Sequence, residues 1–321
     1  MVHGPLGGVF EPVIPEWAYQ DGNEYFVGGV QSPNTNITNS VDHIVKCGDR
    51  MFLMGVYAYR SHQPYYVTIN AMEYFPDTNT LGTYKQVTIN LQPESWSITI
   101  GADNGIYLLC LDRSGNTYKY DYDTNTASIV SNFPYRDSYN EPDGYGITGF
   151  FDNEDGNTIY AHINQMLYRF STITHAYTTL PKNTAFVRND YNLGFAGICR
   201  LSSINSICVY GGYWYNDAGE LYTFDLSTQA WTYKSHEGLV VGSCNISSYP
   251  DGNTFVMLGS NYLFNGGKLN TCHAYTGTTN TWTDLLSMSG EGGGSPQVTV
   301  KDTVYRMYNN SVLLYINKAF Y

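Results

Sequence analysis

The sequence predicts an all-β fold, and three observations lead to this prediction. A short run of β-branched and aromatic residues occurs six times, with starts 55, 53, 48, 48 and 49 residues apart. Each run follows a turn containing Gly, Asn or Asp, residues that tolerate the backbone angles of a tight hairpin. A second aromatic-containing run follows each first one. A period of about 50 residues with four strands per unit is typical of a propeller. We therefore expect a six-bladed β-propeller of four-stranded antiparallel blades.

The first recurring run is expected to form the second strand of each blade. Its copies are RMFLMG from Arg50, GIYLLC from Gly105, TIYAHI from Thr158, SICVYG from Ser206, TFVMLG from Thr254 and TVYRMY from Thr303. The turns before them, in the same order, are CGD, ADN, EDGN, SIN, PDGN and VKD. Because each run lies directly after such a turn, it reads as the returning strand of a hairpin.

The second recurring run is expected to form the third strand, and each copy contains one aromatic anchor. The anchors are Tyr74, Tyr120, Phe170, Phe224, Tyr275 and, in a degraded copy, Tyr315. Each precedes a polar turn of the type D-x-x-T-N, and the better copies continue with a large residue such as Trp231 or Trp282. We expect a fourth strand after this turn and the aromatic side chains packed between neighbouring sheets.

The unit from Val209 to Tyr233 resembles the kelch repeat. Its apolar strand ends in Gly211-Gly212, a variable loop follows, and Phe224 and Trp231 stand at the spacing of the kelch Tyr and Trp. The other units depart from the family pattern, since only Gly55 and Gly259 keep part of the diglycine and no Pro-Arg opens a unit. The resemblance extends over residues 41–321 and implies a propeller fold. It implies no single activity, because propellers host binding proteins and enzymes alike.

The N-terminal segment is expected to complete the last blade. The chain ends just after the third strand of the last unit, and an exposed edge there would invite association. Residues 1–40 hold no full repeat, but VFEPVIP and EYFVGG read as strands. We therefore expect 1–40 to latch the last blade, forming a single domain with the propeller at 41–321. The alternative is that this segment is a disordered arm.

Composition argues against several classes of partner. Lys and Arg number 16 against 28 Asp and Glu, a formal net charge of −12, which opposes binding to the phosphates of nucleic acid. No apolar run is long enough for membrane insertion. Six cysteines stand without a CxxC pair. Cys199 and Cys208 could face each other across a hairpin and form a disulfide, or all six could remain buried thiols.

No catalytic residues, metal site or cofactor are expected. The seven histidines include no HExxH motif and fall at different places in the repeats. The segment from Asp152 to Asn157, DNEDGN, faintly resembles a calcium loop but lacks the downstream Glu, so hairpin chemistry explains it. One alternative remains open, a secreted copper radical oxidase resembling galactose oxidase. That resemblance implies two His, two Tyr and a Cys linked to a Tyr at one metal, and no local motif for this set is present.

One face of the propeller is expected to bind a partner. All the long loops, among them 57–66, are expected on the face opposite the short turns, and loops on a rigid scaffold are where recognition usually resides. Aromatic and amide side chains there suit contacts with a protein or stacking on sugar rings. The alternative is that these tyrosines fold back and cap the propeller. The candidate partner-binding residues are Tyr57, Tyr59, Tyr66, Arg136, Tyr139, Tyr191, Tyr213, Trp214, Tyr215 and Tyr262.

The sequence thus predicts a non-enzymatic binding or structural-assembly module that recognises a protein or glycan or assembles with itself. Few basic residues, many Tyr and Asn and an acidic balance favour an extracellular location or the surface of a virion or cell. Sequons at Asn36, Asn245 and Asn309 permit glycosylation on a eukaryotic secretory route. A carbohydrate-binding lectin is one form of this hypothesis.

Overall fold

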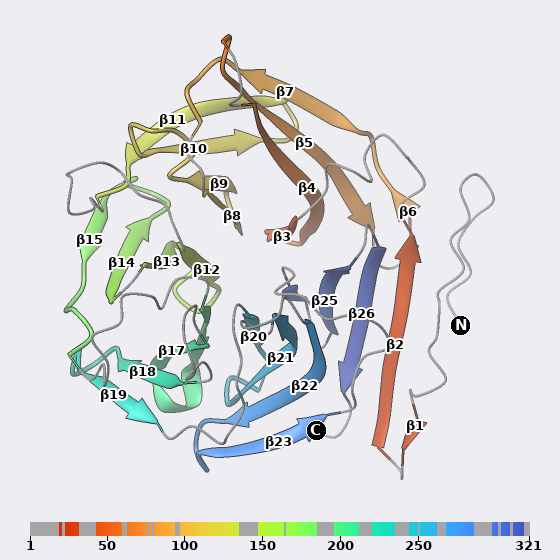
Figure 1. The fold of residues 1–321 in the computed structure, drawn as a ribbon, viewed down its shortest axis with the longest axis vertical. Coiled ribbons are helices and arrows are strands. Elements are labelled where there is room, and N and C mark those ends of the chain that lie inside the picture. Colours follow the sequence, from red (N-terminus) through yellow and green to blue (C-terminus); the bar gives the residue numbers. More distant parts are fainter. Residues whose placement is uncertain are drawn as a thin grey trace.

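The described part of the protein consists of strands and turns (Figure 1). The computed structural model describes residues 19–20, 23–31, 43–59, 63–75, 78, 80–93, 97–134, 147–163, 165–184, 196–211, 220–234, 244–249, 251–261, 268–285, 297–300, 303–308 and 311–317. Within these ranges there is a single 3-10 turn, Ser202–Ile204, and no α-helix. The all-β prediction is therefore confirmed.

The described strands form six antiparallel sheets, named here I to VI in chain order. Sheet I contains β3 (His43–Cys47), β4 (Arg50–Tyr59), β5 (Tyr66–Phe75), β6 (Thr80–Leu81) and β7 (Lys85–Ile89). Sheet II contains β8 (Ile98–Ala102), β9 (Gly105–Leu109), β10 (Asn116–Asp121) and β11 (Thr126–Asn132). Sheet III contains β12 (Thr148–Asp152), β13 (Thr158–Ile163), β14 (Met166–Ser171) and β15 (Tyr177–Thr179).

The remaining three sheets complete the set. Sheet IV contains β16 (Gly197–Leu201), β17 (Ser206–Tyr210), β18 (Leu221–Asp225) and β19 (Trp231–Lys234). Sheet V contains β20 (Cys244–Ser248), β21 (Thr254–Asn261), β22 (Lys268–Thr276) and β23 (Thr281–Leu285). Sheet VI contains β24 (Gln297–Val300), β25 (Thr303–Tyr308) and β26 (Ser311–Asn317), to which β2 (Asn23–Gln31) and β1 (Tyr19–Gln20) add at one edge. The recurring runs expected as second and third strands occupy those places in each sheet.

The sheets surround a common centre in chain order (Figure 1). The first strand of each sheet contacts the first strand of the next, in the order β3, β8, β12, β16, β20, β24, and β24 in turn contacts β3. The later strands of each sheet lie progressively farther out. Sheet VI joins the two ends of the described chain, because β2 pairs antiparallel with β26 from Tyr25 opposite Asn317 to Gln31 opposite Ser311. That this pairing latches the architecture stays a prediction.

Glycines on the inner strands allow neighbouring sheets to approach closely. A Cβ atom on Gly101 of β8 would lie 1.9 Å from the backbone oxygen of Lys46 on β3. A Cβ atom on Gly197 of β16 would lie 2.8 Å from the backbone nitrogen of Ile246 on β20. Contacts this short do not occur with real side chains, so any other residue would push these strands apart.

The aromatic anchors lie in the interior. Tyr74, Tyr120, Phe170, Phe224 and Tyr275 are each at most 1% exposed. In sheets II to V the anchor packs against the preceding sheet, as Phe224 of sheet IV does against Tyr160 and Leu167 of sheet III. The predicted packing of these aromatics between sheets is therefore confirmed for sheets II to V. Burying an aromatic side chain here contributes strongly to the association of the sheets.

The D-x-x-T-N turn serves the anchor in two sheets. Tyr120 Oη donates to Asn125 Oδ1 at 2.9 Å, and Tyr275 Oη donates to Asn280 Oδ1 at 2.8 Å. The turn residue with positive φ is Asn125, His175, Gln229 and Asn280 in sheets II to V, with φ of 53°, 56°, 55° and 55°. Asn therefore occupies this position where the anchor has a hydroxyl, and another residue occupies it where the anchor is Phe. One role of the turn is therefore to supply an Asn side chain that accepts a hydrogen bond from the buried Tyr hydroxyl.

Candidate binding face

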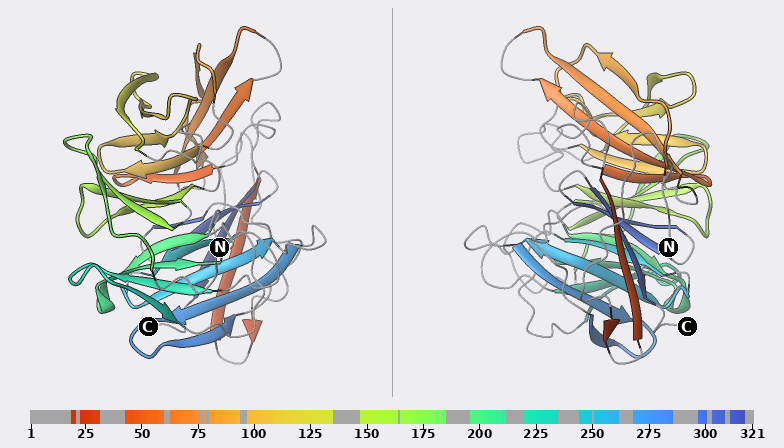
Figure 2. Two further views of the ribbon diagram at one scale, coloured as in Figure 1. Left: turned by 60° about the vertical axis from the view of Figure 1, so that its left-hand side comes forward. Right: turned by 90° about the vertical axis from the view of Figure 1, so that its right-hand side faces the viewer.

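The β4–β5 hairpin of sheet I positions the candidate site. Both strands have ten residues, and their pairing runs from Met51 opposite Tyr74 to Tyr59 opposite Tyr66. Sheet I, coloured orange, lies at one end of the molecule in both views of Figure 2. Strand β7 pairs with the tip half of β5, from Val67 opposite Ile89 to Ala71 opposite Lys85. The tip of the hairpin is therefore part of a three-stranded sheet.

Alternation along the strands separates an apolar face from an aromatic and polar one. Successive side chains of a strand point to opposite faces. Phe52, Met54, Val67, Ile69 and Ala71 face sheet II and belong to its shared apolar core. The intervening positions point the other way.

Toward the hairpin tip, those intervening positions hold what we call the tyrosine face, namely Tyr57, Tyr59, Tyr66, Thr68 and Thr88.

The tyrosine face combines one exposed ring, that of Tyr57, and two half-buried rings, those of Tyr59 and Tyr66, with hydroxyl groups. Tyr57 is 54% exposed. The rings of Tyr59 and Tyr66 stack across the two strands, with centroids 4.9 Å apart and planes inclined by 9°. Thr68 lies opposite both Tyr57 and Thr88, and its Oγ1 is 3.3 Å from Thr88 Oγ1. Such a surface offers large apolar area beside hydrogen-bonding groups.

Hydrogen bonds fix the inner edge of the tyrosine face. Asn70 is 3% exposed, and its Oδ1 accepts from Tyr84 Oη at 2.7 Å and from Gln86 Nε2 at 3.0 Å. Partial burial raises the pKa of Tyr84, so its hydroxyl stays protonated and able to donate. Because these bonds join β5 to β7 and the segment before it, the tyrosine face rests on a preorganised base, which lowers the entropic cost of binding.

The structure corrects the predicted setting of three candidate residues. The segment 57–66 was expected to be a loop, but β4 extends through Tyr59 and β5 begins at Tyr66. The alternation of Tyr57, Ala58 and Tyr59 continues that of the strand, which explains the difference. The structure therefore brings Tyr57, Tyr59 and Tyr66 together on strands. The other seven candidates, Arg136, Tyr139, Tyr191, Tyr213, Trp214, Tyr215 and Tyr262, lie outside the described residues.

Sequence reasoning missed the residues supplied by β7 and the segment before it. Thr88, Gln86 and Tyr84 join the site although no repeat pattern marks them. The available signal was the alternation in Lys85–Ile89, KQVTI, where Gln86 and Thr88 stand between Lys85, Val87 and Ile89.

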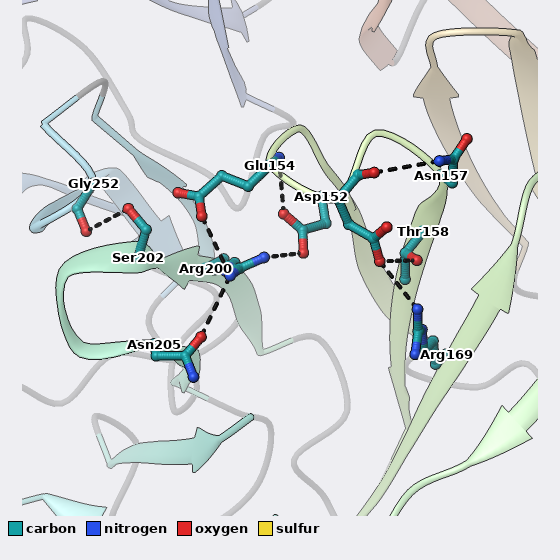
Figure 3. Close-up of polar contacts among 10 residues, drawn as sticks. Asp152, Glu154, Asn157, Thr158, Arg169, Arg200, Ser202, Asn205 and Gly252 are labelled. Atoms are coloured by element: carbon teal, nitrogen blue, oxygen red, sulfur yellow. Dashed lines mark hydrogen bonds and ion pairs between the residues drawn. The ribbon is translucent and has the colours of Figure 1, made fainter. Parts of the chain in front are cut away.

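The acidic turn of sheet III has a structural role (Figure 3). Arg200 of sheet IV donates from Nη1 to Asp152 Oδ2 at 2.6 Å, and its Nη2 lies 3.3 Å from Glu154 Oε2. Arg169 Nη2 pairs with Asp155 Oδ2 at 3.2 Å. Asp152 and Glu154 therefore join sheet III to sheet IV through Arg200, and Asp155 pairs with Arg169 within sheet III.

Two of the described histidines, His162 and His273, are buried in different sheets. His162 of sheet III is completely buried beside Trp231, and burial lowers the pKa of its imidazole to about 3. His273 of sheet V pairs through Nδ1 with Asp284 Oδ1 at 2.9 Å. In the part of the chain that the structure describes, no three His, Cys, Asp or Glu side chains gather as a metal-binding group.

Two cysteines meet across the first hairpin of sheet IV. Cys199 and Cys208 are directly opposite in the register of β16 and β17, and both are buried free thiols. Burial raises the pKa of both thiols, that of Cys208 to about 12. The sequence left open whether Cys199 and Cys208 form a disulfide or remain thiols, and in the structure they are free thiols.

Comparison with known protein families and curated proteins finds no match. No model of a protein family matches the chain, and no curated protein matches its sequence. Across the described ranges, no helix has the length and apolar character needed to cross a membrane.

Proposed function

We propose that this chain is a kelch-like, six-bladed β-propeller that acts as a non-enzymatic binding or structural-assembly module. The order of the six sheets, the contacts between successive inner strands and the contact of β24 with β3 support the propeller. The addition of β2 to sheet VI supports a ring closed by the N-terminal segment. The resemblance of the Gly211, Phe224 and Trp231 unit to kelch repeats is consistent with this architecture.

The tyrosine face is the observation that carries the binding role. Capping of the propeller would bury these rings, but Tyr57 is 54% exposed on β4, which pairs with β5, and β5 in turn pairs with β7. An exposed Tyr on a rigid strand provides contact area at small entropic cost, which is common at recognition surfaces. The partner that fits is a protein surface or a glycan, since rings and hydroxyls dominate among the described residues of the face.

The location and wider role follow from the same chemistry. A module with a net charge of −12 and an aromatic recognition surface suits the outside of a cell or virion, where it binds a receptor, a glycan or further copies of itself. The seven candidates from Arg136 to Tyr262 that lie outside the described residues belong to this proposal as additional contacts from the loops.

A pair of variants tests the proposed face. Tyr57→Ala combined with Tyr59→Ala is compared with Tyr233→Ala, a partly exposed Tyr on the outer strand of sheet IV. Binding to glycans is measured on a glycan array. Binding to proteins is measured by cross-linking each variant to its neighbours in an extract of the native source. We expect the double variant to bind at least about tenfold more weakly, the size of a typical hot-spot loss, while its melting temperature stays close to that of the control. Unchanged binding by the double variant would remove the tyrosine face from the function. Stoichiometric copper in the purified protein would instead favour the oxidase alternative.

A further inference from the structure

Two cysteines in the first hairpin of sheet IV stand at the spacing of a disulfide. Cys199 of β16 and Cys208 of β17 are direct partners in the antiparallel register. Directly opposite residues of an antiparallel pair have Cα atoms about 4.5–5.5 Å apart. Disulfides join Cα atoms that are about 4.4–6.8 Å apart. The backbone of this hairpin therefore already has the geometry that the bond needs.

The two side chains also lie on the same face of the hairpin. Both belong to the apolar cluster that sheet IV forms with Ile246, Phe255 and Met257 of sheet V. Cys199 is 3% exposed and Cys208 is fully buried. Burial raises the pKa of the Cys199 thiol, and the neighbouring Cys208 raises that pKa further. The two thiols are therefore close to each other inside one apolar cluster.

This arrangement sets the pair apart from the other cysteines in the described strands. In the strand registers, three further cysteines have a residue other than cysteine opposite them: Cys47, Cys244 and Cys272. Cys110 follows the end of β9 and lies outside the strands. Within the described pairings, the hairpin of β16 and β17 is thus the place where two cysteines meet.

We propose that Cys199 and Cys208 form a disulfide when the chain folds in an oxidising compartment. The oxidant is a low-molecular-weight disulfide such as oxidised glutathione. One cysteine thiolate attacks a sulfur of that disulfide and releases one thiol, and the other cysteine then displaces the second thiol. One S–S bond is exchanged for another, and the two protons of the cysteines end on the two released thiols. The free thiols of the structure are the reduced form of this pair.

The bond forms before the boundary between sheets IV and V closes. In the folded protein both thiols are shielded, and their raised pKa leaves little thiolate to attack an oxidant. The open chain has no such protection during folding. After closure the same shielding keeps reductants away from the finished bond. The pair is therefore a structural disulfide and not a redox sensor.

The bond fixes an inner strand in place. Strand β16 contacts β12 of sheet III and β20 of sheet V, so a covalent link from β16 to β17 also restrains these neighbours. The loop that it closes is short, which limits the stabilisation to a rise of about 5 °C in the melting temperature. An oxidised pair agrees with the proposed location outside the cell, and it is independent of the tyrosine face.

Peptide mapping tests the bond directly. The full chain is produced in an oxidising secretory compartment and in a reducing cytosol, and free thiols are alkylated in denaturant before digestion. Trypsin leaves Cys199 in the peptide 189–200 and Cys208 in the peptide 201–234. We expect the two peptides to be linked in the oxidised preparation and alkylated separately in the reduced one. Alkylated, unlinked peptides from folded protein of the oxidising compartment would overturn the proposal, as would a link from either peptide to another cysteine.

Thermal unfolding of the same two preparations measures the effect of the bond. We expect the oxidised wild type to melt about 5 °C above the reduced one. For Cys208→Ala the two preparations should melt alike, whereas Cys47→Ala, which changes a half-buried cysteine of β3, should keep the difference. A difference that persists in Cys208→Ala would assign the effect to another bond and overturn the proposal. If Cys208→Ala does not fold, the peptide map of the wild type decides.

Discussion

The boundary between sheets I and II and the boundary between sheets IV and V are built alike near the centre and differently outside. Near the centre each depends on a glycine, Gly101 against Lys46 in one and Gly197 against Ile246 in the other. The inner strands of neighbouring sheets must approach closely where the sheets converge, so both boundaries have a glycine there.

The outer half of the IV–V boundary is aromatic. Trp282 of sheet V packs against Tyr210 of sheet IV, with ring centroids 4.7 Å apart, and also against Phe255 and Tyr275. Trp282 lies directly opposite the anchor Tyr275 in the register of β22 and β23. The anchor and its partner thus fill the space between the sheets with apolar area.

The outer half of the I–II boundary, called here the ionic boundary, combines apolar packing with ion pairs. Where sheet V has Trp282, sheet II has the small Ala127, opposite the anchor Tyr120. Arg50 of sheet I binds Glu73 of its own sheet at 2.8 Å and Asp123 of sheet II at 2.9 Å, beside the Phe52–Tyr122 ring pair. Its guanidinium lies 5.3 Å from the centroid of Tyr122.

A second cation completes this boundary. Lys85 Nζ donates to the Tyr122 backbone oxygen at 2.8 Å and lies 4.5 Å from the centroid of the Tyr122 ring. The Tyr122 ring therefore has a cation from each of two strands of sheet I, β4 and β7. The same boundary in the repeat thus holds a large aromatic side chain in one pair of sheets and ion pairs with cation–π contacts in another.

The largest expected loss of stability comes from replacing Gly101, the inner-strand glycine at the I–II boundary. Gly101→Ala would place a Cβ atom 1.9 Å from the Lys46 backbone oxygen, and backbone cannot move aside cheaply. We expect a loss of about 3 kcal/mol or more in the free energy of unfolding, measured by urea denaturation. Gly156→Ala is the control, because no atom lies within 4 Å of the Cβ built there, although its positive φ makes some strain unavoidable. Equal losses in the two variants would show that crowding at the inner strands is not the cause.

The next effect is at the aromatic boundary. Trp282→Ala removes a side chain in contact with three aromatic rings, and we expect it to cost about 3 kcal/mol. The contacts removed are apolar, so the loss in the free energy of unfolding should be the same at low and high salt. Urea denaturation at two salt concentrations measures both points, and a loss that shrinks with salt would contradict the contrast between the boundaries.

A smaller effect is expected at the ionic boundary. Arg50→Met keeps the aliphatic stem and removes the contacts to Glu73, Asp123 and Tyr122. Since Arg50 is partly exposed, solvent screens these contacts, and we expect a loss of about 1 kcal/mol that diminishes at high salt. A loss as large as that of Trp282→Ala would mean that the ionic boundary is the stronger one.

The smallest effect is a pH dependence confined to the ionic boundary. The hydrogen bonds from Arg50, with Lys85 nearby, lower the pKa of Asp123 below its ordinary value of 3.8. A carboxylate whose pKa is lower in the folded state than in the unfolded state stabilises the protein at pH values above its pKa in the unfolded state. This stabilisation is lost as the pH falls through its pKa in the folded state. Wild type and Asp123→Asn should therefore differ in melting temperature at pH 7 and converge below pH 3.8. A difference that persists at pH 2 would refute this origin.

Much of the fold could be predicted because its signals are local. Hairpin turns before Gly105 and Thr254 and the anchors Tyr120 and Tyr275 are each set by a few neighbouring residues, and they recur with a period of about 50 residues. The tyrosine face could be predicted only in part. Tyr57, Tyr59 and Tyr66 were found as candidates, but their place on strands depended on the pairing of β4 with β5.

The sequence by itself determined the order of strands, the turns and the apolar anchors, because alternation and turn chemistry act over a few residues. Only the tertiary structure decided which sheets touch and how. The contact of Arg50 with Asp123 spans 73 residues, and the space available at Gly101 is set by a strand more than 50 residues earlier. No local pattern encodes such contacts, since they arise when six similar sheets pack against one another and must fill the spaces left between them.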